Sequence, residues 1–277
     1  MSEVVTHSPQ APQISLELDS AELAETYDRA SLPQFTHGKA LIELLGLVSG
    51  QRVLDVGCGT GKLGEYVAGL VAPDGEVVGI DPLPLRVTLA SRKHPRLRAS
   101  VGRAEDLSQF GDATFDAVYS NSVFHWVDDK PRALSEALRV LKPGGRIAIN
   151  SADSDRPHQS VTLVRDAAVE AGLKQASAFG GLNQQLRVNE AELGRLLREA
   201  GFDQVSVRPH TITDDIANAD ELLAWSNSSS FGNFLSEIAP SDQRRVRDLL
   251  QQKLEARRTA AGIKLERYLV FASAQKR

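Results

Sequence analysis

Short apolar runs alternate with segments of helical periodicity from about residue 52 to residue 150. Five of these runs are typical of β-strands: RVLDV, EVVGID, RASVG, FDAVYS and GRIAINS. The segment PRALSEALRVL repeats apolar residues at i, i+3, i+4 and i+7 on one helix face, namely Leu134, Ala137, Leu138 and Leu141. KPGG at 142–145 is expected to end this helix. Because strands that alternate with helices build parallel sheets covered on both faces, the pattern predicts an α/β fold.

The second half predicts more helix and two further strands. Helical stretches are expected near 158–172 and 190–200, before a strand-like run, GFDQVSVRPHTIT, at 201–213. Two helices are expected within 217–258, and ERYLVFASAQ at 266–275 is typical of a last strand.

The expected domain organisation follows from these two strands. If they pair as an antiparallel hairpin, the chain between them, about 215–262, forms a helical insertion that acts as a lid above the sheet. The start of the chain, MSEVVTHSPQAPQ, is expected to be a flexible tail over residues 1–16. Residues 17–277 then form a single domain.

Composition places the chain among soluble globular proteins, with 42% hydrophobic and 25% charged residues. A net charge of −4 gives no field that would gather nucleic acid or anionic lipid. No apolar run approaches the roughly 18 residues that span a bilayer, and the start lacks the order of a signal peptide. The one cysteine, Cys58, suits a reducing compartment. We expect a cytoplasmic monomer or homodimer that binds neither nucleic acid nor membrane.

A glycine-rich turn follows the first predicted strand, which carries Asp55 near its end. Gly57, Gly59 and Gly61 can take positive φ and let a ligand lie against the backbone. N–H groups at the start of the next helix favour a negative ligand group. A dinucleotide fingerprint requires its third glycine where this chain has Lys62, which is expected to be solvated at the helix start. The turn therefore predicts a nucleoside-like ligand without requiring a pyrophosphate.

A second acid strengthens this interpretation. Asp81 closes the second predicted strand, 24 residues after Gly57 (81 minus 57). An acid at this place can accept hydrogen bonds from both hydroxyls of a ribose, as it does in dinucleotide folds. The inferred ligand thus has a ribose, with a small polar group near the glycines.

Five motifs occur in a fixed order over residues 50–150: VLDVGCGTGKLGEYVA, VVGIDP, GRAEDL, FDAVYSNSVFHWVDD and ALRVLKPGGRIAI. As a set they resemble the class I S-adenosylmethionine (SAM)-dependent methyltransferases. The resemblance implies a Rossmann-like seven-stranded sheet with an antiparallel last strand and helices on both faces. It implies S-adenosyl-L-methionine as cofactor and S-adenosyl-L-homocysteine as product. The residues that would bind the methionine part, the ribose and the adenine are Asp55, Gly57, Cys58, Gly59, Gly61, Asp81, Pro82 and Leu83.

One motif departs from the family's pattern. Many relatives carry Asp or Asn before the alanine of the third motif, GRAEDL in this chain. In those relatives the Asp or Asn side chain accepts a hydrogen bond from the adenine amino group. Here Arg103 precedes Ala104 and Glu105, and an arginine has no acceptor to offer. We expect the backbone of Ala104 or the carboxylate of Glu105 to take this contact, and Asn121 to contact the cofactor as well.

The candidate chemistry lies in SNSVFHWVDD, at the carboxyl edge of the sheet, where open α/β folds bind ligands. Methyl transfer mainly requires alignment, and it needs a base only if the acceptor loses a proton. His125 is the candidate base, because it can be neutral at physiological pH and the resemblance aligns it with a catalytic histidine of some relatives. The alternative is a histidine that is hydrogen-bonded to the backbone and shapes the pocket.

Aromatic residues are the candidates for the acceptor side. Trp126 is expected in the pocket wall or the core, and Tyr27 resembles the tyrosine of an N-terminal helix that covers the cofactor in relatives. Trp225, Phe231 and Phe234 suit a lid over an organic substrate, with plain helix packing as the alternative. The C-terminal part resembles, more weakly, relatives that methylate free carboxylates of small acids. It lacks an evident basic cluster, so we expect a larger or less charged substrate.

Three functions stay open at this stage. The leading one is methyl transfer to a small molecule in specialised metabolism. A SAM-binding enzyme that catalyses a cyclisation or rearrangement fits the same motifs. Nucleic-acid methylation is less favoured, because NSVF differs from the Asn/Asp-Pro-Pro-aromatic motif used on exocyclic amines. His158 and His210 are isolated in the sequence, and no ligand spacing supports a metal site.

Overall fold

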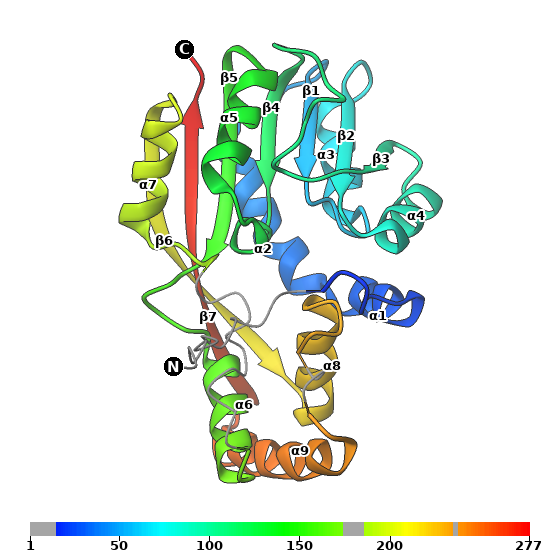
Figure 1. Cartoon of the computed structure of the whole chain (residues 1–277), viewed down its shortest axis with the longest axis vertical. Coiled ribbons are helices and arrows are strands. Elements are labelled where there is room, and N and C mark those ends of the chain that lie inside the picture. The colour runs from blue at the N-terminus through cyan, green and yellow to red at the C-terminus, as the bar shows by residue number, and fades with distance from the viewer. Residues whose placement is uncertain (1–14, 174–185, 235–237) are drawn as a thin grey trace, which may run out of the picture.

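The centre of the protein is a seven-stranded sheet with the order β3-β2-β1-β4-β5-β7-β6 (Figure 1). The structure is a computed structural model that describes residues 15–173, 186–234 and 238–277. Strand β7 is antiparallel to both of its neighbours, and the other pairs are parallel, so the expected α/β sheet with an antiparallel last strand is confirmed. The strand bounds are β1 Arg52–Val56, β2 Glu76–Asp81, β3 Leu97–Val101, β4 Phe115–Ser120, β5 Leu141–Ala152, β6 Asp203–Ile216 and β7 Ile263–Gln275.

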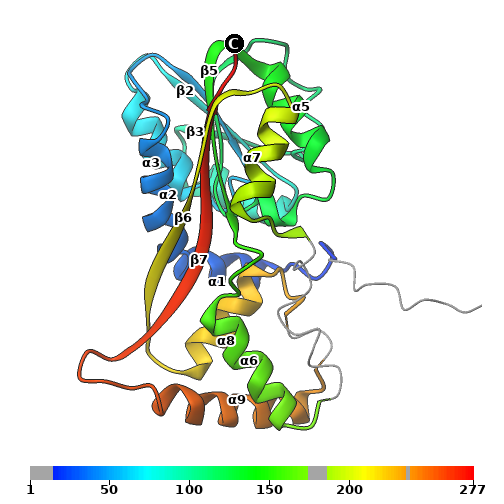
Figure 2. The same ribbon diagram turned by 90° about the vertical axis from the view of Figure 1, so that its left-hand side faces the viewer.

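Helices cover both faces of this sheet, with α2 and α3 on one side and α5 and α7 on the other (Figure 2). A short 3-10 turn, η1, spans Phe124–Trp126 after β4. The helix bounds are α1 Ala21–Ala30, α2 Leu32–Glu43, α3 Lys62–Val71, α4 Pro84–Lys93, α5 Lys130–Val140, α6 Gln159–Glu170, α7 Glu190–Glu199, α8 Ala219–Ser229 and α9 Pro240–Glu255.

The sequence pattern locates the strands closely, with one instructive difference at β5. Its expected start at residue 145 is wrong, because Leu141 already pairs with Phe115 of β4. The next pair is Ala117 with Arg146, so the KPGG segment forms a bulge between the two pairs. Gly144 lies in this bulge with φ +78°, a conformation that glycine adopts without strain. The segment that ends α5 therefore also lies within the strand.

Strands β6 and β7 are longer than the strands beside them and leave the main body as a two-stranded ribbon (Figures 1 and 2). The ribbon carries α8 and α9 at its far end, in the chain that was expected to form an insertion. Helix α6, which comes from outside this segment, packs against α9 there. The three helices and the ribbon share one apolar cluster that includes Leu163, Val164, Leu222, Val246, Leu250, Ile263 and Leu265.

The N-terminal end of the described chain is bound beside α8. Residues 1–14 of the expected tail lie outside the described residues. The Ser15 N–H donates to Asn233 Oδ1 at 3.0 Å, and Asn233 Nδ2 donates to the Ser15 carbonyl at 2.9 Å. Over the three described ranges, no helix is long and apolar enough to cross a bilayer.

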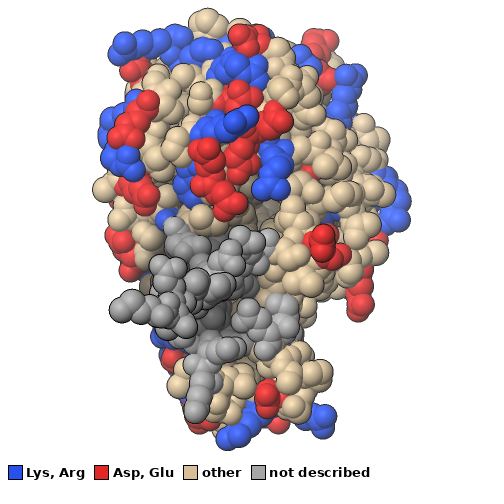
Figure 3. Space-filling view, viewed as in Figure 1, with Lys and Arg blue, Asp and Glu red and all other residues tan. Residues whose placement is uncertain are grey.

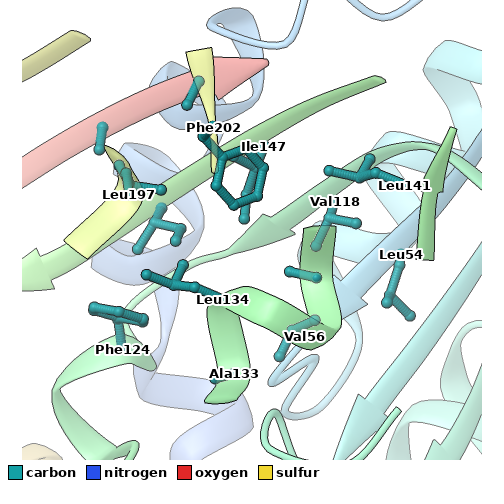
Figure 4. Packing of buried hydrophobic residues seen from close by; sticks show 14 of the residues in the cluster. Leu54, Val56, Val118, Phe124, Ala133, Leu134, Leu141, Ile147, Leu197 and Phe202 are labelled. Atoms are coloured by element: carbon teal, nitrogen blue, oxygen red, sulfur yellow. The ribbon is translucent and has the colours of Figure 1, made fainter. Parts of the chain in front are cut away.

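The main core lies between the sheet and the pair α5 and α7 (Figure 4). Leu134 and Ala137 are buried on the predicted apolar face of α5, whereas Leu138 is only partly buried against the same cluster. Leu197 of α7 and Val118 of β4 complete the contact. A second cluster fills the opposite face, beneath α2 and α3. The two cores thus pack against both faces of the sheet at whose edge the site forms.

Leu134→Ala is expected to lower the free energy of unfolding by about 2 to 5 kcal/mol, because it leaves a cavity in the larger core. Leu134 is 1% exposed, whereas Leu32 at the start of α2 is 64% exposed. Leu32→Ala is therefore the matched control and should change stability by about 0.5 kcal/mol or less. Urea denaturation measures both, and equal effects of the two substitutions would contradict the packing described.

Candidate active site

The turn after β1 adopts the conformation that its glycines predict. Gly57, Gly59 and Gly61 have φ values of +84°, +53° and +89°. A Cβ atom on Gly57 would lie 2.2 Å from Cγ2 of Val123, so no other residue fits there without displacement. The N–H groups of Gly57 and Cys58 donate to the Ile80 carbonyl at 2.7 and 2.9 Å. The turn is thereby tied to the end of β2.

Asp81 binds the same turn from the end of β2. Its Oδ2 accepts the Gly59 N–H at 2.9 Å and its Oδ1 accepts the Leu83 N–H at 3.0 Å. Burial raises the pKa of Asp81, and the nearby Arg86 guanidinium opposes this shift. An ionised carboxylate has about four acceptor positions, so each oxygen can still accept a hydroxyl. The expected contact of Asp81 with two ribose hydroxyls stays a prediction.

Asp55 lies beneath the turn rather than on the wall of the main cavity. Its side chain is buried, and Oδ2 accepts the Tyr119 hydroxyl at 2.6 Å. Burial raises the pKa of Asp55 to about 7, against the lowering effect of the Tyr119 hydrogen bond. With Cys58 and Gly61 it lines a small hollow of about 40 Å³, next to the main one.

A cavity of about 760 Å³ lies at the carboxyl ends of the parallel strands, where it was predicted. Its walls come from the glycine turn, the end of β2, the loop after β4, α1 and the chain around α8. It brings together most of the expected cofactor and substrate residues, namely Tyr27, Gly57, Gly59, Asp81, Pro82, Leu83, Asn121, His125, Trp126, Trp225, Phe231 and Phe234.

The third motif does not place its expected residues on this wall. Ala104 packs against the main core, and the Glu105 carboxylate accepts the Asp128 N–H at 3.3 Å. Arg103, which precedes them, lines the cavity instead. Arg103 and Asp128 line the cavity, whereas Ala104 and Glu105 do not. The expected contact from Ala104 or Glu105 to adenine stays a prediction.

Asn121 holds the loop after β4 in position. Its Nδ2 donates to the Gln34 carbonyl of α2 at 3.1 Å, and its Oδ1 accepts from Asn150 Nδ2 at 2.8 Å. Asn150 Oδ1 in turn accepts the N–H of Ser122, which has φ +60°. The amide of Asn121 is therefore used within the protein, although the residue lines the cavity.

His125 lies in η1 and is bonded to the backbone. Its Nδ1 accepts the Ala152 N–H at 3.2 Å. Burial lowers the pKa of His125 to about 3, and the positive charges of Arg187 and Lys130 add to this effect. This is the alternative that the sequence left open, a histidine hydrogen-bonded to the backbone. A ring with so low a pKa is neutral at physiological pH but is a weak base.

Aromatic rings from distant segments meet around a buried arginine. The Trp126 and Phe231 ring centroids lie 4.8 Å apart. The Arg86 guanidinium lies 4.1 Å from the Tyr27 ring centroid and 5.0 Å from that of Phe231. Its Nη2 donates to the Ser228 carbonyl at 2.6 Å. Arg86 thus joins α4 to α1 and α8 at the wall of the cavity.

Sequence reasoning missed Arg86, although a signal existed. The residue is 3% exposed and shares the buried face of α4 with Leu89 and Ala90, at i+3 and i+4. A charged residue on an apolar helix face indicates either a buried ion pair or a ligand. Asp19 supplies the pair here, with 3.6 Å between Arg86 Nη2 and Asp19 Oδ1.

The cavity wall contains arginines that the sequence did not indicate. Arg86, Arg187 and Arg267 all line the cavity, although about 80 to 100 residues separate each from the next in sequence. Arg267 is paired with Asp214 of β6. It occupies the inward position of β7 between Leu265 and Leu269, so the period of two was a signal for its burial. Only the fold could place the three arginines in the wall of one cavity.

Lys62 is not simply solvated as expected. Its ammonium group donates to the Asp28 carbonyl and lies 3.6 Å from the Asp28 carboxylate. Lys93 of α4 pairs with the same carboxylate at 2.6 Å. The neighbouring residues Tyr27 and Asp28 therefore have different roles: Tyr27 lines the cavity, and Asp28 fixes α1 to α3 and α4. Among the described residues, no group of three or more His, Cys, Asp or Glu side chains could hold a metal ion.

Comparison with known proteins also indicates a methyltransferase. Residues 54–149 match the family model described as a methyltransferase domain. The chain is 28% identical over 209 residues to a trans-aconitate 2-methyltransferase of Deinococcus radiodurans, which covers 74% of this chain and 79% of that protein. It is 44% identical over 103 residues to a demethylmenaquinone methyltransferase of Symbiobacterium thermophilum, which covers 35% of this chain and 41% of that protein. The chain thus spans most of the first relative but less than half of the second.

A solved structure shows the same fold. Phosphoethanolamine N-methyltransferase 2 of Haemonchus contortus, in complex with S-adenosyl-L-methionine, matches with a TM-score of 0.60 and 18% identity. The match covers 93% of this chain and 57% of that chain.

The sheet order, the glycine turn and the acid that closes β2 agree with the fold expected of class I SAM-dependent methyltransferases. The chain belongs to this family of enzymes, and its cofactor is S-adenosyl-L-methionine.

Asp81→Ala is expected to weaken binding of S-adenosyl-L-homocysteine by about 1 to 3 kcal/mol, because two hydrogen bonds to a charged group are lost. Asp74→Ala is the matched control, since Asp74 is exposed in the loop before β2. Calorimetric titration measures both affinities. Unchanged affinity in the Asp81 variant would remove the assignment of the ribose to this carboxylate.

The raised pKa of Asp55 makes stability depend on pH. The folded protein holds the proton up to about pH 7, whereas the unfolded chain releases it near pH 4. Protonated Asp55 therefore adds its full contribution to the free energy of unfolding below about pH 4. This contribution is lost as the pH rises through about 7.

Asp55→Asn stays neutral and can still accept the Tyr119 hydroxyl. The variant should therefore gain stability relative to the parent protein between pH 4 and 7, by at most about 4 kcal/mol. Urea denaturation at several pH values gives the difference between the two proteins. A difference that is constant over this range would show that Asp55 is ionised in the folded protein.

Proposed function

We propose that this enzyme transfers the methyl group of SAM to a small organic acceptor, as a step of specialised metabolism. One observation carries the proposal. A single cavity runs from the cofactor residues Gly57, Gly59 and Asp81 to the aromatic residues Trp126 and Phe231. Its volume of about 760 Å³ lies within the range of small-molecule sites.

The residues of the chain have separate tasks in this reaction. Bound SAM supplies an activated methyl group, so the protein has to position and shield the reactants. Asp81 binds the ribose hydroxyls, while Pro82 and Leu83 form the wall beside the adenine. Tyr27 lies over the glycine turn, where a Cβ on Gly59 would be 3.5 Å from the tyrosine ring.

The chain around α8 covers the acceptor side as a lid. Trp225, Phe231 and Phe234 contribute apolar surface that excludes water from the transfer. Trp225 Nε1 donates to Gln34 Oε1 at 3.4 Å, which ties α8 to α2 across the cavity. The hydrogen bonds between Ser15 and Asn233 fasten the same side. Opening of this lid would admit the acceptor and release the product.

The proposed acceptor is a free small molecule and not a nucleic acid. The first relative acts, by its name, on trans-aconitate, which is a small molecule. On the face that Figure 3 shows, acidic and basic side chains are intermixed over the upper body. A surface that binds a phosphate backbone gathers positive charge along one path instead.

A labelled-methyl experiment tests the proposal. The purified protein is incubated with methyl-labelled SAM and, separately, a small-molecule extract, tRNA and DNA. Label should enter a low-mass product, with one S-adenosyl-L-homocysteine formed for each methyl transferred. At low SAM concentration Asp81→Ala should transfer less label than the parent protein, and Asp74→Ala is the matched control that should transfer as much. Label in nucleic acid, or conversion of a substrate without S-adenosyl-L-homocysteine, would refute the proposed function.

A further inference from the structure

Two segments far apart in the sequence meet at the cavity and together cover one side of it. They are residues 15–31 and residues 226–234, which we call the cover. Helix α1 of the first segment packs against α8, whose end belongs to the second (Figure 1). Ser15 and Asn233 join the two segments by hydrogen bonds of 3.0 and 2.9 Å. Because residues of both segments line the cavity, access to it depends on where the cover lies.

Arg86 of α4 contacts both segments of the cover at once. Its Nη2 donates to the Ser228 carbonyl at 2.6 Å and lies 3.6 Å from Asp19 Oδ1. Its guanidinium also lies 4.1 Å from the ring centroid of Tyr27 on one segment and 5.0 Å from that of Phe231 on the other. The side chains of Arg86 and Asp19 are each 4% exposed, so solvent screens this ion pair little. Removal of one partner from a buried pair is strongly destabilising for the arrangement it holds.

The backbone of Arg86 is joined to the acid that is expected to bind the cofactor. The Arg86 N–H donates to the Leu83 carbonyl at 3.1 Å, and the Leu83 N–H donates to Asp81 Oδ1 at 3.0 Å. The positive charge of Arg86 also opposes the rise in the pKa of Asp81 that burial causes. A ligand that binds Asp81 therefore contacts the same hydrogen-bonded turn that carries Arg86.

Phe231 of the cover has a strained backbone in this arrangement. Its φ of +61° lies in the left-handed region, which is costly for a bulky residue. Its ring is contacted by Trp126, at 4.8 Å between ring centroids, and by the Arg86 guanidinium. Such a conformation persists only where surrounding contacts hold it. Loss of the Arg86 contact should therefore favour release of this part of the cover from the cavity.

We propose that Arg86 is a positioning residue that couples cofactor binding at Asp81 to closure of the cover. The inference rests on the proposed function, in which Asp81 binds the ribose of SAM. Arg86 acts through the cover in this role and not on the methyl group. Because the cover borders both the cofactor part and the acceptor part of one cavity, both ligands exchange through the same opening.

The two tryptophans of the chain report directly on the cover. Trp126 packs against Phe231, and Trp225 lies in α8 just before the second segment of the cover. Both side chains are partly buried, so a neutral quencher such as acrylamide can measure how far they are shielded. S-adenosyl-L-homocysteine added to the full-length protein should decrease acrylamide quenching of their fluorescence, because the cover closes over the bound ligand.

Arg86→Met removes the charge and the hydrogen-bond donors but keeps an unbranched side chain. In stopped-flow fluorescence it should release S-adenosyl-L-homocysteine about tenfold faster or more, and it should lose most of the ligand-dependent decrease in quenching. Arg92→Met is the matched control. Arg92 also joins α4 to α1, through Glu25, but its side chain is 65% exposed, and exposed ion pairs contribute little. Equal release rates in the two variants would contradict the proposal.

Asp19→Asn tests the same contact from the cover and keeps the proposal testable if Arg86→Met does not fold. It removes the charge that faces Arg86 and leaves the turn at Asp81 unchanged. It should speed release of S-adenosyl-L-homocysteine about threefold or more, and its effect should be less than additive with that of Arg86→Met. A merely structural role of Arg86 would lower the urea midpoint and leave the ligand-dependent decrease in quenching intact, which would overturn the proposal.

Calorimetric binding of S-adenosyl-L-homocysteine separates this proposal from the proposed function. If the parent protein binds the ligand but its quenching does not change, the coupling is wrong and the proposed methyl transfer stands. If the parent protein binds no S-adenosyl-L-homocysteine, the proposed function is wrong, and the coupling fails with it.

Discussion

The buried carboxylate of Asp81 is the contact on which the rest of the site depends. It accepts one backbone N–H from the glycine turn and one from the start of α4, so two loops at adjacent strand ends share one anchor. A buried carboxylate without such partners would be costly, and the bonds that stabilise it also shape the pocket. Under the proposed function, the same group offers its remaining lone pairs to the ribose. Stability and cofactor binding would then use one residue.

The ribbon of β6 and β7 determines the acceptor side. Because these strands continue past the neighbouring ones, they carry α8 and α9 out to a position from which the lid aromatics face the cavity (Figure 1). The ribbon also brings Arg267 and the Tyr268 N–H to the place where β5 ends.

The parts of the fold that follow from local pattern could be predicted closely. Strands β1, β2 and β4 have the bounds that their apolar runs indicate, and the apolar face of α5 is buried at Leu134. The glycine turn was predictable for the same reason, since positive φ is a property of single residues. The start of β5 was predicted too late. The KPGG segment both follows the end of α5 and forms a bulge inside β5, and the hydrophobic pattern indicated only the end of the helix.

The sequence by itself determined the sheet, the turn and the acid that closes β2, because short-range periodicity and glycine conformation depend on neighbouring residues. Only the tertiary structure decided the chemistry of the acceptor side. It bonds the His125 ring to the backbone N–H of Ala152, bonds the Glu105 carboxylate to the Asp128 N–H, and places His158 and Arg187 in the wall of one cavity. These outcomes depend on contacts between segments far apart in the chain, and the protonation of a buried group is set by those contacts.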